Sequence, residues 1–186
     1  KDISLWSDVV KKSPNKARPH FNLGAAYSKQ NRSQEAIPFY RRALEIKPNL
    51  AQPHVNLGKA LEQQNKMDEA FEHYKTALKL KPDLPEAHAN IGSILAKKGR
   101  TQEAIQHFQS ALEIRPHFVP AHVNLARALV KNGRLDEGLA HYYQAIQFEP
   151  GTVAAHNDLG KLLAETKHYE EALPEFRQAT ALNSRL

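Results

Sequence analysis

The most chemically versatile side chains in this sequence are its ten histidines. Imidazole nitrogens bind transition metals and exchange protons near neutral pH. Eight of the histidines fall into two rows whose members recur at one constant interval, namely His20, His54, His88, His122 and His156, then His73, His107 and His141. Equivalent atoms of successive helical repeats lie on the order of 10 Å apart, whereas one metal ion holds its ligands at about 2 Å. We therefore expect structural histidines and no metal site.

A second row of polar residues lies two positions after the first row of histidines. Its members are Asn22, Asn56, Asn90, Asn124 and Asp158. Asparagine is a poor residue for a helix interior, so its recurrence needs an explanation. The amide offers an acceptor and two donors, which match the groups of a peptide bond. A row of asparagines therefore predicts a surface that holds an extended chain by its backbone. The alternative is a hydrogen bond to the neighbouring repeat, and both roles can hold together.

Positions close to these asparagines are basic or apolar. The basic residues are Lys59, Lys97, Arg127 and Lys131, and the apolar ones are Phe21, Val55 and Val123. The basic residues can pair with acidic side chains of a bound segment, although a merely solvated face would look similar. The apolar residues would add contacts beside the asparagines.

Catalytic signatures are missing from the sequence. It contains no phosphate-binding glycine loop, nucleophile elbow or HExxH motif. The absence of cysteine excludes disulfides and thiolate metal sites. The net charge of +6 is spread among interspersed charges of both signs, and nucleic-acid binding would need aromatic platforms or a basic stripe. We expect a non-enzyme without a cofactor, and a nucleic-acid partner is the weakest hypothesis.

The elements that carry these residues are set by an internal repeat of constant period. Proline marks the period at Pro14, Pro48, Pro82, Pro116 and Pro150. Within each period apolar residues recur at intervals of three and four, which is typical of helices, and a polar break divides each period in two. The chain is therefore expected to be all-α, with five helix-turn-helix repeats at 17–50, 51–84, 85–118, 119–152 and 153–186.

The turns and helix ends carry their own signals. Asparagine or glycine in four of the polar breaks tolerates the left-handed conformation that ends a helix. A serine, aspartate or threonine near the start of the second helix is expected to cap free amides. A glutamate that follows suits the positive helix end, and it recurs as Glu35, Glu69, Glu103, Glu137 and Glu171. Glycines recur on the first helix at Gly24, Gly58, Gly92 and Gly160, which predicts a close approach of the paired helix.

The octet HFNLGAAY from His20, followed by a small residue, an aromatic residue and a proline at fixed spacing, resembles the tetratricopeptide repeat. The resemblance covers 17–186 and implies a right-handed superhelical solenoid whose first helices line a concave face. The asparagine row is similar to that in the repeats of the O-linked GlcNAc transferase, where such residues bind extended protein substrates. Three departures are a histidine in place of the usual tryptophan, Gly138 in place of alanine and Ser184 in place of proline.

The two ends of the chain raise separate expectations. Residues 1–16 read as the second helix of a truncated preceding repeat, with Leu5, Trp6, Val9 and Val10 covering the first full repeat. Solenoid ends normally carry a polar cap, but the last repeat ends with apolar residues. We expect an apolar face there with contributions from Leu173, Phe176 and Leu182, which favours self-association.

Together these features predict a non-catalytic protein-interaction module that binds an extended, preferably acidic, peptide segment in its groove. Two alternatives stay open. The opening, from Asp2 to Tyr27, resembles the junction where bacterial membrane glycosyltransferase-like proteins pass into C-terminal repeats, and a start without methionine looks like a fragment. That alternative makes the chain a substrate-recruiting or regulatory tail outside the cytoplasm. The other alternative is a self-associating scaffold. The identity of the partner is not encoded in these patterns.

Overall fold

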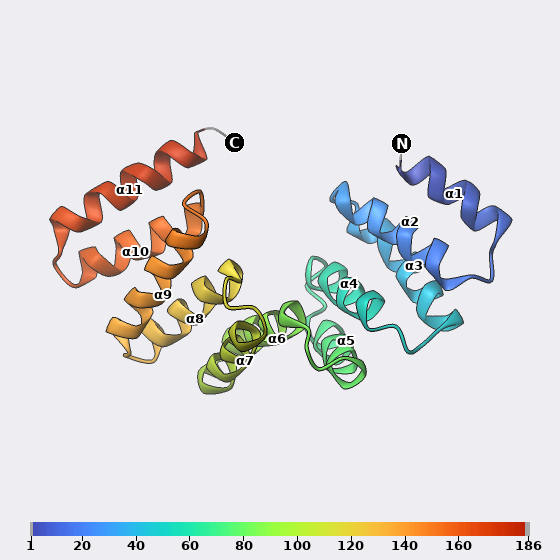
Figure 1. The fold of residues 1–186 in the computed structure, drawn as a ribbon, viewed down its shortest axis with the longest axis horizontal. Helices are drawn as coiled ribbons and strands as arrows, with labels where there is room; N and C mark the ends of the chain where they lie inside the picture. The colour runs from blue at the N-terminus through green and yellow to red at the C-terminus, as the bar shows by residue number, and fades with distance from the viewer. Residues whose placement is uncertain (1, 185–186) are drawn as a thin grey trace. The chain divides into compact units, whose positions relative to one another are not determined.

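The computed structural model describes residues 2–184, which form eleven helices and no strand (Figure 1). In chain order the helices are α1 (Asp2–Lys12), α2 (Ala17–Lys29), α3 (Ser33–Ile46), α4 (Ala51–Glu62), α5 (Met67–Leu80), α6 (Pro85–Lys97), α7 (Thr101–Ile114), α8 (Val119–Lys131), α9 (Leu135–Phe148), α10 (Val153–Glu165) and α11 (Tyr169–Asn183). Each of the five ranges expected as repeats contains two of these helices.

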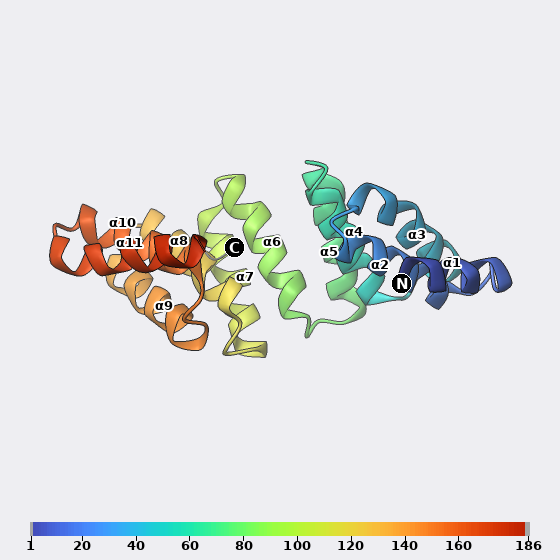
Figure 2. The ribbon, with the colours of Figure 1, turned by 90° about the horizontal axis from the view of Figure 1, so that it is seen from above.

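The helices belong to two compact units, residues 1–91 and 92–186, with the boundary inside α6. In the first unit α2 packs against α3, α4 packs against α5, and α1 lies on α2. In the second unit α8 packs against α9, and α10 packs against α11 (Figures 1 and 2). Each unit is thus built from helix hairpins, and successive hairpins within it also pack on each other.

The turn inside each hairpin adopts the left-handed conformation that the asparagines and glycines predict. The positive φ angles are 58° at Asn31, 59° at Asn65, 78° at Gly99 and 79° at Gly133. The fifth turn uses Lys167, with φ of 67°, although neither asparagine nor glycine stands there. The prediction is therefore confirmed at four turns, and the fifth shows that the hairpin geometry can impose this conformation on a lysine.

The prediction of helix capping by serine, aspartate or threonine is wrong. Ser33 is already inside α3, and the preceding residue, Arg32, occupies the N-cap without a side-chain bond to the helix amides. Arg32 instead binds Glu35 through two hydrogen bonds of 2.6 Å. Arg100 with Glu103 and Arg134 with Glu137 repeat the arrangement. In these three repeats the recurring glutamate therefore binds an arginine at the helix start, whereas Glu69 of the second repeat lies 3.8 Å from Lys66.

The recurring glycines lie where an aromatic ring of the second helix meets the first helix. A Cβ atom at Gly58 would lie 2.6 Å from Cε1 of Tyr74, which is fully buried. Gly24, Gly92 and Gly160 face the rings of Tyr40, Phe108 and Phe176 in the same way. The close approach predicted from the sequence is thus confirmed, and its partner is a ring.

The unusual glycine of the fourth repeat has a different cause. A Cβ atom at Gly138 would lie 2.5 Å from Cγ2 of Val130 on the paired helix. In the repeat before and the repeat after, alanines Ala96 and Ala164 occupy the position of Val130, and the position of Gly138 is also alanine. The β-branched valine of the fourth repeat therefore requires the glycine opposite it.

The end helices only partly match their expectations. On α1, Trp6 is half-buried but Leu5 is 58% exposed, so Leu5 does not contribute to the cover of the first repeat. On α11, Leu173 is 51% exposed, whereas the ring of Phe176 packs over Gly160. The exposed apolar surface of α11 thus includes Leu173 together with Tyr169 rather than the Phe176 ring.

Candidate functional site

A polar pocket of about 390 Å³ lies between α2 and α4, the first helices of two successive repeats in the first unit. Its charged lining consists of Lys29 and Lys59, and it contains no carboxylate. Neither lysine has an ion-pair partner within residues 2–184. Asn56 and Gln63 add amides to the same wall. Because the hydroxyl of Ser33 donates to Oε1 of Gln63, the NH2 group of Gln63 remains a donor.

A smaller pocket of about 180 Å³ lies on the other side of α2, against α1. Asn22 and Trp6 line it, and it shares Ala25 and Lys29 with the pocket between α2 and α4. The side chain of Asn22 makes no hydrogen bond within the described part of the chain. The first unit therefore has adjoining hollows on both sides of α2, and both contain a residue of the asparagine row.

Two residues of that row contact a tyrosine hydroxyl of the preceding repeat, Tyr40 for Asn56 and Tyr74 for Asn90. Burial raises the pKa of Tyr40, and hydrogen-bond interactions with Ser28 and Asn56 partly offset that rise. Burial and Glu62 likewise raise the pKa of Tyr74, and Asn90 partly offsets that rise. These asparagines therefore have a structural role as well as a place on the surface.

Two other members of the asparagine row, Asn22 and Asn124, have no tyrosine in the preceding repeat at the position of Tyr40 and Tyr74. Trp6 stands there for Asn22, and Phe108 stands there for Asn124. The buried Nδ2 atom of Asn90 has no close hydrogen-bond partner within residues 2–184, so its contact with Tyr74 is longer than an ordinary hydrogen bond. The structural explanation thus covers part of the asparagine row and leaves Asn22 without one.

Replacing Tyr74 with phenylalanine should lower the free energy of unfolding by about 1–2 kcal/mol, because a hydrogen bond to a carboxylate is lost. The Tyr74 hydroxyl donates to Oε2 of Glu62 at 2.6 Å, and the ring is fully buried. Phe108 fills the equivalent position naturally, so the ring itself fits. Urea unfolding measures the change, and Tyr143→Phe at a 46% exposed site is the matched control. A loss equal to that of the control would contradict the role of this hydroxyl.

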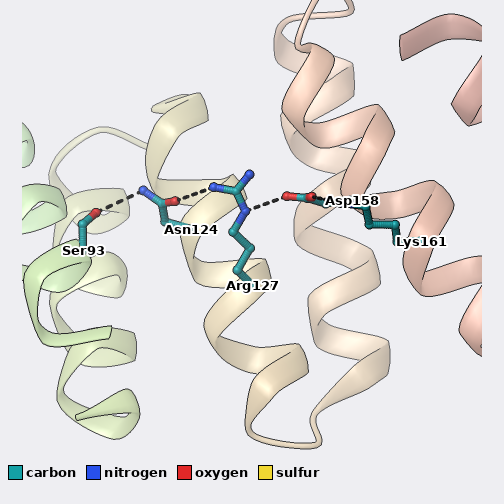
Figure 3. Close-up of polar contacts among 5 residues, drawn as sticks. All are labelled: Ser93, Asn124, Arg127, Asp158 and Lys161. Carbon is teal, nitrogen blue, oxygen red and sulfur yellow. Dashed lines mark hydrogen bonds and ion pairs between the residues drawn. The ribbon is translucent and has the colours of Figure 1, made fainter. Parts of the chain in front are cut away.

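In the second unit, Asn124 and Asp158 of the asparagine row form hydrogen bonds with neighbouring polar side chains (Figure 3). Nδ2 of Asn124 donates to Oγ of Ser93 at 3.2 Å, and its Oδ1 accepts from Nη1 of Arg127 at 3.2 Å. Nε of Arg127 also donates to Oδ2 of Asp158 at 2.6 Å, and Nζ of Lys161 lies 4.0 Å from Oδ1 of that carboxylate. Asn124 and Arg127, both predicted to bind a ligand, are thus already engaged within the chain.

The second unit also has a counterpart of the pocket between α2 and α4, about 230 Å³ in volume. It lies between α8 and α10 and is lined by Tyr142 and five charged residues, Arg127, Lys131, Asp158, Lys161 and Glu165. Three of these side chains are positive and two are negative. Burial and the Asp158 carboxylate raise the pKa of Tyr142, and both side chains line this pocket.

The apolar residues expected beside the asparagines separate into two groups. Val55 and Val123 are only 1% and 5% exposed, so they pack in the core and present almost no surface to a ligand. Phe21 is half-buried and lines an apolar pocket of about 570 Å³ together with Ile46 and Leu50. Of the basic residues, Lys97 is exposed near the end of α6 and lines none of the pockets described above.

The histidine rows, which sequence reasoning considered separately, meet in pairs across the hairpins. Nε2 of His54 donates to the carbonyl oxygen of Pro48 at 3.2 Å, so its Nδ1 accepts from Nδ1 of His73 at 2.9 Å. His122 and His141 form the same contact at 3.0 Å. The constant offset between the two rows was the signal that could have revealed these pairs.

The equivalent contact differs in the first and last repeats. His20 stacks on Phe39 with ring centroids 6.5 Å apart, and Nδ1 of His156 lies 2.6 Å from Oε2 of Glu175. In both, Nε2 again donates to the carbonyl of the preceding proline, Pro14 or Pro150. This shared bond gives the recurring histidine a structural role, because its N–H group ties the start of the helix to the carbonyl of the preceding proline.

Within residues 2–184 no group of three or more histidine, cysteine, aspartate or glutamate side chains has a geometry that could hold a metal ion. None of the helices in the same range combines the length and the apolar character that a bilayer crossing requires.

Helix hairpins that recur at a constant period, each packed on the next within its unit, define a helical-repeat protein of the kind that mediates protein interactions. Models of the tetratricopeptide repeat match residues 17–50, 95–140 and 123–185, and a further model described as TPR repeat matches 62–99. The chain belongs to the tetratricopeptide repeat family. No curated protein sequence gives a significant match.

Solved structures of the same fold include three examples at low sequence identity. A MamA structure from Desulfovibrio magneticus RS-1 is 20% identical, with a TM-score of 0.75, over 91% of this chain and 96% of that one. PilF of Pseudomonas aeruginosa is 20% identical, with a TM-score of 0.80, over 89% of this chain and 75% of that one. YrrB, described as a TPR protein with an unusual peptide-binding site, is 22% identical, with a TM-score of 0.71, over 95% and 91%.

Proposed function

We propose that the chain is a non-catalytic interaction module that binds an extended segment of a partner protein along the first helices of its repeats. The observation that carries this proposal is the pair of adjoining hollows on either side of α2, which present Asn22, Lys29 and Asn56. The membership in the tetratricopeptide repeat family supports it, as does the peptide-binding site described for YrrB.

The spacing of the hollows suits an extended chain. Packed helices lie about 8–10 Å apart, and an extended chain advances about 3.3 Å per residue. About three residues of a bound segment therefore correspond to one repeat. The side-chain amide of Asn22 offers an N–H donor and a C=O acceptor, so it can pair with the acceptor and the donor of one peptide group. The lysines of the neighbouring pocket favour a segment that contains acidic side chains.

Changing Asn22 to alanine should weaken peptide binding about fivefold to tenfold, because an amide that makes one or two hydrogen bonds to the ligand is lost. The melting temperature should stay unchanged, since Asn22 makes no hydrogen bond within the described residues. Binders are selected from a random phage-displayed dodecapeptide library on the full chain, and their affinities are measured by fluorescence anisotropy.

Asn49→Ala, at an exposed asparagine between α3 and α4, is the control and should bind the selected peptides normally. Failure to select any peptide would overturn the proposal, and so would equal binding by the Asn22 and Asn49 variants. Asn56 and Asn90 are poorer test sites because each contacts a buried tyrosine hydroxyl, so their loss would also change stability.

A further inference from the structure

The pocket between α2 and α4 in the first unit and the pocket between α8 and α10 in the second are built from equivalent positions, three repeat periods apart. Lys29, Lys59 and Tyr40 of the first unit correspond to Lys131, Lys161 and Tyr142 of the second. Both sets line the pocket of their own unit. The two pockets therefore share a framework of two lysines and one tyrosine.

The pockets differ where an amide in one is a carboxylate in the other. Asn56 corresponds to Asp158, and Gln63 corresponds to Glu165. These substitutions change charge with almost no change in shape. The first pocket consequently holds two positive side chains and no negative one, whereas the second holds both signs.

Internal pairing widens the difference between the pockets. Arg127 and Lys161 both contact the Asp158 carboxylate, at 2.6 Å and 4.0 Å. Arg127 replaces Ala25, which occupies the equivalent place in the first pocket. The second pocket therefore satisfies much of its own charge. In the first pocket the two ammonium groups lack a carboxylate partner within residues 2–184.

We propose that the pocket of the first unit, formed by Lys29, Lys59, Asn56 and Gln63, is a specificity pocket for an aspartate or glutamate side chain of the bound segment, and that the pocket of the second unit is not. The lysines supply charge-assisted hydrogen bonds, and the two amides supply neutral donors, which together complement a carboxylate. This inference rests on the proposed function, because the acidic side chain belongs to the peptide bound along the first helices.

The test uses three capped heptapeptides, Ser-Gly-Ala-X-Ala-Gly-Ser, in which X is glutamate, glutamine or lysine. Each is titrated into the full chain and followed by ¹H–¹⁵N correlation spectra, including the side-chain amide signals of Asn56 and Gln63. The glutamate peptide should bind about tenfold more tightly than the glutamine peptide, as charge-assisted bonds exceed neutral ones, and it should shift those two amide signals.

Matched variants exchange the two pocket chemistries. N56D/Q63E gives the first pocket the carboxylates of the second and should reduce the glutamate peptide to the affinity of the glutamine peptide. D158N/E165Q gives the second pocket the amides of the first, and it should add a glutamate-dependent site near Lys131 and Lys161. Each substitution is nearly isosteric, and circular dichroism melting verifies that the variants remain folded.

The outcomes separate this inference from the proposed function. If the glutamine and glutamate peptides bind equally to the first helices, the proposed function stands and the inference is wrong. The inference is also wrong if the glutamate peptide shifts signals around Asp158 as strongly as around Asn56. If sodium glutarate binds as tightly as the glutamate peptide, the pocket takes small free acids instead. If none of the three heptapeptides binds although the library yields binders, the inference is wrong and the proposed function stands.

Discussion

Lowering the pH from about 7.5 to about 5.5 should destabilise this protein and lower its melting temperature by several degrees. Burial lowers the pKa of His54, His73, His122 and His141 below the ordinary value of 6.5. The folded state therefore resists protonation that the unfolded chain accepts. The stability that these four histidines contribute is fully present above 6.5, the pKa of histidine in the unfolded chain. It is lost as the pH falls from 6.5 toward their lower pKa values in the folded state.

The paired geometry gives a structural reason for this loss. Each pair is joined by one hydrogen bond between two Nδ1 atoms, so one of these atoms must lack a proton. A pair can hold one positive charge, but two would place protonated nitrogens about 3 Å apart. Arg41 near His73 and His117 near His122 add further unfavourable charge, which Glu69 partly offsets at His73. At His141 the favourable effect of Glu137 outweighs the unfavourable effect of Arg134.

The measurement is chemical unfolding at both pH values for the native chain and for H73F/H141F. Phenylalanine is the matched replacement, because Phe39 occupies this position in the first repeat and stacks on His20. The variant should show a clearly smaller decrease in stability at low pH. Glu35, Glu103 and Glu137 do not account for a decrease in this window, because their arginine partners lower their pKa below 4.5. An unchanged decrease in H73F/H141F would contradict the assignment to the histidine pairs.

Replacing Gly58 with alanine should reduce the free energy of unfolding by about 1–3 kcal/mol, the usual cost of overpacking. The new methyl group would lie 2.6 Å from the Tyr74 ring, which is fully buried and held by its bond to Glu62. Alanine otherwise favours a helix over glycine by about 1 kcal/mol, so the steric effect must exceed the gain in propensity. Gly151→Ala, at a site with no neighbouring atom within 4 Å, is the control in a denaturant titration.

The fourth repeat offers an independent check on the same steric reasoning. Gly138→Ala should be destabilising beside Val130 but less so in the V130A background, because alanine pairs with alanine at these positions in the third and fifth repeats. The two changes should therefore be non-additive.

The prediction for Gly58 is wrong if Gly58→Ala proves as stable as the native chain. In that case the Tyr74 ring can move to accept the added methyl group.

The local features of the fold were predictable from the sequence because they depend on neighbouring residues. The constant period, the apolar spacing and the left-handed turns at Asn31 and Gly99 all follow from short-range rules. Capping was predicted wrongly, since serine at a helix start is only a tendency. The side chain of Arg32, which is long enough to reach Glu35, decided that position instead.

The candidate site was only partly predictable, because its properties depend on residues that meet across helices. The sequence by itself determined that Asn22, Asn56 and their equivalents share one helical phase, a consequence of the constant period. Only the tertiary structure decided that Val55 is buried, that Asn56 contacts Tyr40, and that Arg127 is held by Asp158. Such contacts depend on helix packing and rotamers, since they join residues of different helices whose separation in the chain does not specify their distance in space.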